Sequence, residues 1–230
     1  MDREGWNVLD EERGVWWREY EFTRGAWATT LAFRADEGVI VLSPAPALDA
    51  RALDAIGALG PVRALVATNG QHHMGQASWR ARFPGAESFA PPAALPVLAR
   101  KLDVPFRSLA ELPLPPHVRW RDVPGFSEGE TLLAIEGSRG PIWFTGDLVT
   151  NIQRTPGPPL RWLFTMTDSA FGLKLFRLAV WSFVKDRKGV RAAVEERFAE
   201  LPPRVIVPGH GPPIEAADLH ARVQVELAKL

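Results

Sequence analysis

Four short apolar runs, each ended by polar or turn-forming residues, constrain the fold of this chain most strongly. The runs VIVL, ALVA, IWF and VIV occupy residues 39–42, 64–67, 142–144 and 205–207. Continuous apolar runs of this length are typical of strands that are buried on both faces. A segment with helical spacing, residues 48–59, lies between the first two runs and ends at Gly60-Pro61. The sequence therefore predicts a sheet whose two faces are both covered.

Predicted strands and helices alternate along most of the chain. The predicted strands cover residues 27–33, 39–42, 62–67, 86–92, 131–137, 141–147 and 204–213. The predicted helices cover residues 48–59, 74–83, 92–102, 168–184, 189–201 and 214–230, and the proline-rich residues 103–124 are expected to be irregular. This order predicts α/β architecture with a mixed sheet or two packed sheets. Because no repeat or low-complexity linker interrupts it, we expect one domain over residues 1–230.

Charge and cysteine content narrow the expected partners. The formal net charge is zero and no cluster of lysine and arginine stands out, so we expect neither nucleic acid nor a membrane as the main partner, but a small-molecule substrate. The polar, acidic residues 1–14 do not resemble a signal peptide, and no apolar run reaches about 18 residues. The absence of cysteine fits a cytoplasmic protein and excludes thiolate ligands.

Polar residues follow each of the buried strands. These residues are Ser43, Asn69 with His72 and His73, Asp147, and His210. In open α/β sheets, ligands bind beyond the carboxyl ends of the strands, so these side chains are expected to meet at one rim. Imidazole and carboxylate are ordinary ligands of zinc and other divalent metals. A histidine pair in a turn, a Gly-Asp turn and a Pro-Gly-His loop are each unremarkable alone, but together they predict a metal site.

The two adjacent histidines would face opposite ways on a regular strand. In a loop between Gly70 and Gly75 they could instead converge on one ion, because glycine eases an unusual backbone path. The remaining histidines, His117 and His220, are interpreted as surface or structural residues.

Most of the chain resembles the metallo-β-lactamase fold superfamily. The resemblance rests on the segments LAFRADEGVIVLSPAP, ALVATNGQHHMGQASWRARFPGAESFAPP, VPGFSEGETLLAIEG, PIWFTGDLV and VIVPGHGPP. Within that superfamily, NGQHHMG resembles a branch whose loop reads Asn-x-x-His-His. The resemblance implies an αββα sandwich, in which two mixed β-sheets are flanked by helices.

The resemblance also implies that one of the superfamily's two metal sites has been lost. Asn69, Gln71 and Phe126 stand where the first site normally has three histidines. The second site maps onto His72, His73, Asp147 and His210, with histidine replacing an aspartate at position 72. This set would hold one divalent ion, with zinc the first expectation and iron or manganese the alternatives.

The implied ligand set leaves two geometries open. Four protein ligands would close a tetrahedral zinc site, whereas a His72 that swings away would leave three ligands and a water. His72 would then serve as general base beside Asp147. The resemblance also implies polar support from Asn69 and Gln71, and from Ser43, where many members have an aspartate that orients a ligand.

Two further segments are interpreted with their alternatives. Glu128 and Glu130 lie near the lost histidine position and could reach inward as ligands, but a solvated turn is the favoured interpretation. The aromatic residues 160–184 could form a lid, a pocket wall or a homodimer contact, or could simply pack in the core.

The functional expectation follows from the resemblance. It implies a mononuclear metal-dependent hydrolase of an ester, lactone, thioester or phosphoester. The alternative is a metal-free or inactive relative that binds a small ligand or a protein.

Overall fold

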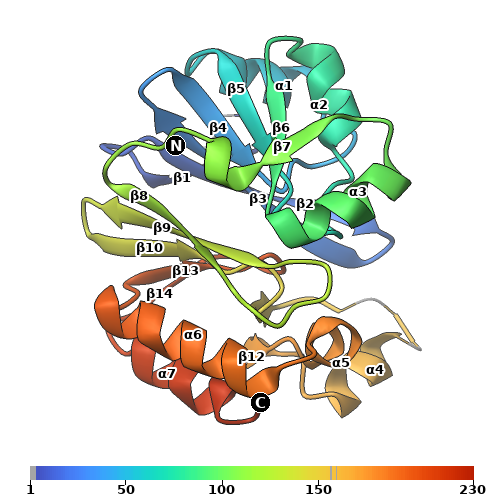
Figure 1. Cartoon of the computed structure of the whole chain (residues 1–230), viewed down its shortest axis with the longest axis vertical. Coiled ribbons are helices and arrows are strands. Elements are labelled where there is room, and N and C mark those ends of the chain that lie inside the picture. Colours follow the sequence, from blue (N-terminus) through green and yellow to red (C-terminus); the bar gives the residue numbers. More distant parts are fainter. Residues whose placement is uncertain (1–3, 156, 159) are drawn as a thin grey trace.

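Two large β-sheets pack face to face, with helices on the outer face of each. The structure is a computed structural model that describes residues 4–155, 157–158 and 160–230. In Figure 1 the helices α1, α2 and α3 lie over one sheet, and α6 and α7 lie over the other. Both sheets combine parallel and antiparallel pairs. The prediction of two mixed sheets flanked by helices is therefore confirmed.

The first sheet has seven strands in chain order. They are β1 (Asn7–Asp10), β2 (Val15–Thr23), β3 (Ala26–Ala35), β4 (Gly38–Leu42), β5 (Val62–Val66), β6 (Glu87–Ala90) and β7 (Phe106–Ser108). Strands β1 to β4 pair antiparallel, and β4 to β7 pair parallel. The parallel strands are joined through α1 (Ala50–Gly57), α2 (Gln76–Arg82) and α3 (Leu95–Lys101), with a 3-10 turn (Pro92–Ala94) before α3.

The second sheet has the order β14-β13-β10-β9-β8. Its strands are β8 (Val118–Asp122), β9 (Thr131–Gly137), β10 (Gly140–Phe144), β13 (Val205–Val207) and β14 (Ile214–Glu215), and its helices are α6 (Arg187–Glu200) and α7 (Leu219–Leu227). A separate pair of strands, β11 (Val149–Ile152) and β12 (Gly172–Leu175), lies near α4 (Leu160–Met166) and α5 (Arg177–Phe183). A second 3-10 turn (Leu109–Glu111) precedes β8.

Strand alternation explains the continuous apolar runs. On β4, Ile40 and Leu42 belong to the core between the two sheets. Their neighbours Val39 and Val41 face the other way and pack with α1. On β10, the same alternation sends Trp143 outward against α6. Its ring lies 4.9 Å from that of Phe198, centroid to centroid. Each run is apolar throughout because both of its faces are buried.

The structure corrects three predicted segments. Residues 168–184 do not form one helix. Gly172, with a φ of +82°, instead leads into β12, which pairs antiparallel with β11. The helix predicted over 214–230 begins only at Leu219, because Ile214 pairs with Ile206 of β13. Residues 103–124 are not wholly irregular, since they contain β7 and β8. In each case pairing with another strand overrides the local pattern.

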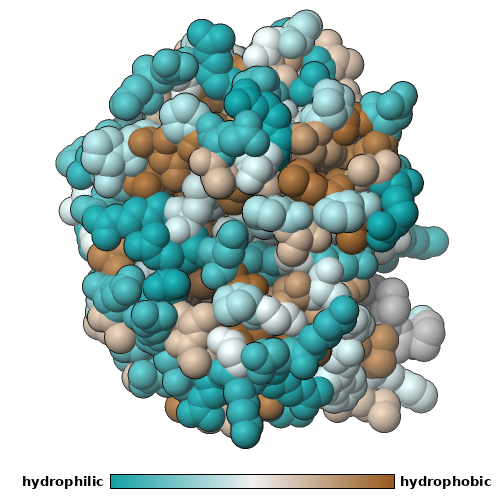
Figure 2. Space-filling model, in the orientation of Figure 1, coloured by the Kyte–Doolittle hydropathy of each residue, from teal (hydrophilic) through white to brown (hydrophobic). Residues whose placement is uncertain are grey.

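Helix α6 is amphipathic, with a polar face toward solvent and an apolar face toward the sheet. Hydrophilic residues gather over α6 in Figure 2, whereas its Val190, Val194 and Phe198 are buried against the second sheet. None of the helices among the described residues has the length and apolar content needed to cross a membrane.

Candidate metal centre

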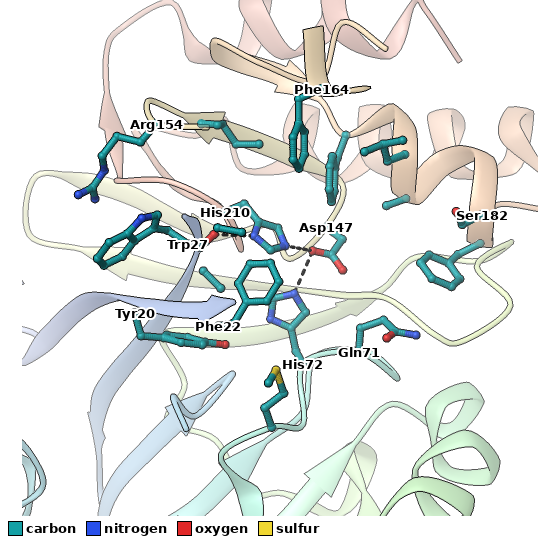
Figure 3. Close-up of a pocket in the computed structure, with 18 residues that line it drawn as sticks. Tyr20, Phe22, Trp27, Gln71, His72, Asp147, Arg154, Phe164, Ser182 and His210 are labelled. Atoms are coloured by element: carbon teal, nitrogen blue, oxygen red, sulfur yellow. Dashed lines mark hydrogen bonds and ion pairs between the residues drawn. The ribbon is translucent and has the colours of Figure 1, made fainter. Parts of the chain in front are cut away.

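Three strand ends bring His72, Asp147 and His210 together. His72 lies in the loop after β5, Asp147 follows β10, and His210 follows β13. One possible ligand atom from each residue lies within 4.8 Å of the others. The Nε2 atoms of His72 and His210 lie 2.9 and 3.1 Å from the same Asp147 oxygen, Oδ1. Figure 3 shows both imidazole rings pointing toward that carboxylate.

The His210 loop depends on close backbone contact with the Asp147 loop. The Gly209 N–H donates to the Gly146 carbonyl at 2.8 Å. A Cβ on Gly209 would lie only 2.6 Å from that same carbonyl oxygen, so a larger residue would push the loops apart. Nδ1 of His210 lies 2.8 Å from the carbonyl oxygen of Trp27. If Nδ1–H donates there, Nε2 is left to face Asp147 as a ligand atom.

Asn69 directs His72 rather than His73 into the site. Its Oδ1 accepts hydrogen bonds from the backbone N–H groups of Gln71 and His72, at 2.8 and 3.0 Å. This side-chain turn folds the loop back on itself, as asparagine commonly does. His73, which the resemblance placed in the ligand set, lies outside the group formed by the other three residues. Burial and the charge of Lys101 hold the pKa of His73 below its ordinary value.

Glu130 lies inside the protein, contrary to the expectation from the sequence. It is buried at 1% exposure, whereas a solvated turn was expected. Its Oε2 accepts from the Asp147 N–H at 3.1 Å, and its Oε1 accepts from the Thr131 N–H at 3.2 Å. Gly146, with a φ of +52°, allows this approach, because a Cβ there would lie 2.2 Å from Glu130 Oε1. The turn lies over the site instead of pointing into solvent.

The amide of Asn69 links the two buried carboxylates. Its Nδ2 donates to Glu130 Oε2 and to Asp147 Oδ2, at 3.0 Å each. Both of its N–H groups are therefore used, so Asn69 has none left for a substrate. The third expected change, Phe126, is buried and offers no ligand atom. At the position where the resemblance implies a lost first metal site, Asn69 therefore hydrogen-bonds to Glu130 and Asp147.

The other two residues expected to support the metal site, Gln71 and Ser43, hydrogen-bond elsewhere. Gln71 lines a cavity that adjoins the three residues and donates through Nε2 to Glu128 Oε2. Glu128 also pairs with Lys101 at 3.5 Å. Ser43 is fully buried and lies 3.2 Å from the Thr68 hydroxyl, oxygen to oxygen. In the described structure these hydrogen bonds direct both polar groups to partners outside the three clustered side chains.

The electrostatics favour an ionised Asp147. Burial alone would raise the pKa of Asp147, but the two histidines hold it well below its ordinary value. Burial and the charge of Asp147 raise the pKa of Glu130 well above its ordinary value. Burial lowers the pKa of His210, but its bonds to Asp147 and Trp27 outweigh this effect and leave it raised. Positive charge is thus favoured next to Asp147.

The donor set fits a divalent transition metal. Two imidazole nitrogens and one carboxylate are the three-residue set that leaves coordination positions open to water or substrate. The histidines already converge on one carboxylate oxygen, and the favoured positive charge could be supplied by a metal ion. His72 Nδ1 is buried and has no hydrogen-bond partner among the described residues.

A largely apolar cavity of about 330 Å³ adjoins the three residues. Its walls include the aromatic rings of Tyr20, Phe22, Trp27, Phe164, Phe176 and Phe183 (Figure 3). Tyr20, the only tyrosine, was not singled out from sequence; it comes from β2, a strand that the sequence did not predict. Burial and the charge of Asp147 raise the pKa of its phenol, which keeps it a hydrogen-bond donor.

The cation at the cavity wall is already neutralised. Arg154 lies 4.4 Å from the centroid of the Trp27 ring and 2.7 Å from a Glu19 carboxylate oxygen. Because Glu19 partners this arginine, its charge is not left free for an anionic substrate.

Comparison with solved structures decides the fold. A metallo-β-lactamase from Pontibacter korlensis superposes with a TM-score of 0.66 at 16% identity, covering 98% of this chain and 99% of that one. The chain has the metallo-β-lactamase fold. The mono-zinc form of a metallo-β-lactamase from Pseudomonas aeruginosa gives a TM-score of 0.61 at 18% identity, with 97% and 94% coverage.

The metallo-β-lactamase fold also occurs within longer proteins. A flavodiiron protein from Giardia intestinalis gives a TM-score of 0.63 at 15% identity, covering 97% of this chain and 59% of that one. No protein-family model and no curated protein matches the sequence. The resemblance noted in the sequence is therefore confirmed as one of fold.

Proposed function

We propose that this protein is a hydrolase that uses one divalent metal ion, held by His72, Asp147 and His210. The observation that carries the proposal is the convergence of both Nε2 atoms on one oxygen of Asp147. Zinc suits this mixture of imidazole and carboxylate best, and iron or manganese would also fit. When bound, such an ion polarises a substrate carbonyl and makes a water molecule more acidic.

The surrounding residues support a neutral, apolar substrate. The cavity is lined mainly by aromatic and aliphatic side chains, and Arg154 is engaged by Glu19. These features favour a carboxylic ester, thioester or lactone with an apolar acyl group over a phosphoester. We propose His72 as a metal ligand and not as the general base.

The chain's own groups would orient the substrate. Tyr20 and Gln71 line the cavity beside the three ligands, and each carries a polar hydrogen that can face a substrate oxygen. We assign Tyr20 as the donor to the oxygen on which negative charge develops, since Gln71 is already bound to Glu128. The aromatic walls would exclude water from the acyl group.

Elemental analysis of protein purified without added metal tests this proposal. We expect about one equivalent of a transition metal, as a single three-residue site requires. His210→Ala should lose the metal, whereas His117→Ala, outside the site, should retain it. Less than about a tenth of an equivalent, with no uptake on titration, would contradict the proposal.

The second candidate is a metal-free protein that binds a small apolar ligand. It is favoured by the short contacts of both Nε2 atoms with Asp147 Oδ1, at 2.9 and 3.1 Å, which hold the three side chains together without an ion. A neutral, apolar fluorescent probe tests it. Uptake of this probe by the metal-free protein, with binding unchanged in His210→Ala, would support this candidate over the hydrolase.

A further inference from the structure

The outer faces of α4 and α5 expose large apolar side chains beside the cavity. Trp162 and Met166 lie four residues apart on α4 and are 69% and 83% exposed. Trp181 on α5 is 56% exposed, and Phe171 between the helices is 48% exposed. Residues four apart share one side of a helix, so Trp162 and Met166 form one apolar ridge. Exposed groups of this kind mark interaction surfaces.

The same segment is basic in a chain with no net charge. Residues 160–188 contain six basic and two acidic residues, a net charge of +4. The basic residues are Arg161, Lys174, Arg177, Lys185, Arg187 and Lys188, and the acidic ones are Asp168 and Asp186. Lys174 pairs with Asp168. In the part of the chain that the structure describes, the other five basic residues form no ion pair.

The inner faces of the same helices form the wall of the cavity. Phe164 of α4 lines it, as do Ala179 and Phe183 of α5. The Phe164 ring stacks on that of Phe176 with centroids 6.1 Å apart. Each helix therefore separates the cavity from an exposed surface that is both apolar and basic.

We propose that the outer faces of α4 and α5 bind the surface of an anionic lipid bilayer. Exposed tryptophan, methionine and phenylalanine suit the boundary between headgroups and acyl chains. Unpaired arginine and lysine beside them suit anionic headgroups. The expectation of no membrane partner rested on the zero net charge of the whole chain, whereas residues 160–188 alone carry a net charge of +4.

Charge also decides against a second copy of this chain on the same surface. A twofold interface would place the net charge of +4 against itself, because both copies present the same patch. Like charges brought together across an interface are strongly unfavourable. A lipid surface of opposite charge removes this penalty.

Vesicle flotation with the full chain tests the proposal. The probes are vesicles of phosphatidylcholine alone and vesicles of phosphatidylcholine with about a third phosphatidylglycerol, which supplies the anionic surface. We expect binding to the anionic vesicles only, and weaker binding in high salt. This binding requires no metal ion, so its outcome is independent of the proposed hydrolase.

Two variants and one control make the test specific. Arg187→Gln with Lys188→Gln should weaken binding on the order of 30-fold, since each cation near an anionic surface contributes about 1 kcal/mol. Trp181→Ala should weaken it about tenfold, the value for ~60 Å² of inserted ring at about 25 cal/mol per Å². Arg13→Gln with Arg51→Gln removes two exposed arginines elsewhere and should change binding little.

Three outcomes would overturn the proposal. One is the absence of binding to anionic vesicles by protein whose circular dichroism is native. Another is equal loss of binding in the control pair and in the Arg187 and Lys188 pair. The third is a dimer that Trp181→Ala dissociates without any vesicle binding, which would assign the surface to a second copy of the chain.

Discussion

Asn69 occupies the position between two buried carboxylates. Its amide donates to Glu130 and Asp147, and its carbonyl oxygen accepts from the His72 loop. Two carboxylates buried side by side repel each other unless a cation or a donor lies between them. Asn69 provides that donor, so we expect the amide to matter for stability as well as for the shape of the loop.

Asn69→Asp separates these two roles. An aspartate retains the oxygen that the loop N–H groups need but replaces the shared donor with a third carboxylate. We expect a loss in unfolding free energy of about 3 kcal/mol at neutral pH, because a buried charged group loses its partner. Urea denaturation of the metal-free protein measures it. Asn69→Ala, which loses both roles but adds no charge, is the control, and a smaller loss for Asp than for Ala would contradict the assignment.

Tyr20 gives a second prediction at the scale of a residue. Tyr20→Phe removes only the hydroxyl that lines the cavity beside Asp147. If this hydroxyl donates to the developing oxyanion, kcat should fall on the order of 100-fold while KM changes little. A chromogenic ester with an apolar acyl chain provides the assay. Phe22→Leu, which alters the same wall without removing a donor, should act mainly on KM; an unchanged kcat in Tyr20→Phe would remove Tyr20 from the mechanism.

The sequence predicted which strand ends would meet, but not which side chains would turn inward. His72, Asp147 and His210 each follow a buried strand, so topology was enough to group them. The direction of His72 rather than His73 depends on the side-chain turn of Asn69. The burial of the Glu130 carboxylate depends on its close approach to Gly146, which has no side chain. Both features are contacts between a side chain and the backbone, which the spacing of residues along the sequence does not predict. The role of His72, Asp147 and His210 as metal ligands stays a prediction.

At the scale of elements, ion pairs of Asp168 link the segment between α4 and β12 to the residues after α7. Its carboxylate pairs with Lys174 of β12 at 2.9 Å and with Lys229, which follows α7, at 3.0 Å. Hydrogen bonds from these two lysines lower the pKa of Asp168 to about 2. Its φ of +49° is one that asparagine adopts readily, so Asp168→Asn removes the charge without straining the backbone.

Asp168→Asn should therefore lower stability only where the aspartate is ionised. A lowered pKa means that the stabilisation is present above the unfolded value near 3.8 and is lost as pH falls toward about 2. Because the pair is partly solvated, we expect less than about 1 kcal/mol. Thermal melts at pH 7 should differ between wild type and variant, and the difference should narrow below about pH 4. Glu11→Gln, an exposed control, should show none; a difference that persists at low pH would argue against the ion pairs.

The segment from 168 to 184 shows where element prediction fails. Its apolar and aromatic content is compatible with a helix, but β12 forms there and pairs antiparallel with β11. Strand pairing of this kind depends on partners far away in the sequence. The helix predicted over 189–201 is observed as α6, because its buried residues recur every four positions. Its start at Arg187, which the spacing did not predict, follows the N-cap Asp186.

At the scale of the molecule, the two sheets each contribute to one site. His72 follows a strand of the first sheet, whereas Asp147 and His210 follow strands of the second. The apolar runs predicted that the strands are covered on both faces, but they left one sheet or two open. Only the resemblance implied the four-layer arrangement. The apolar cavity could not be predicted, since its walls come from β2, β3 and the α4–α5 segment, which only the folded chain brings together.

An ion bound by all three residues would therefore tie the two sheets together. Because such an ion binds only the folded chain, it stabilises by mass action, by about 2.7 kcal/mol when free metal is 100-fold above its Kd. For a chain of this size that corresponds to a rise in Tm of roughly 5–10 °C. Differential scanning calorimetry with a chelator, and again after zinc is restored, measures it. His117→Ala should respond as the wild type does, and His210→Ala should not respond. A Tm that is the same with chelator and with excess zinc would mean that no ion joins the sheets, and the histidines and Asp147 would then hold them through hydrogen bonds alone.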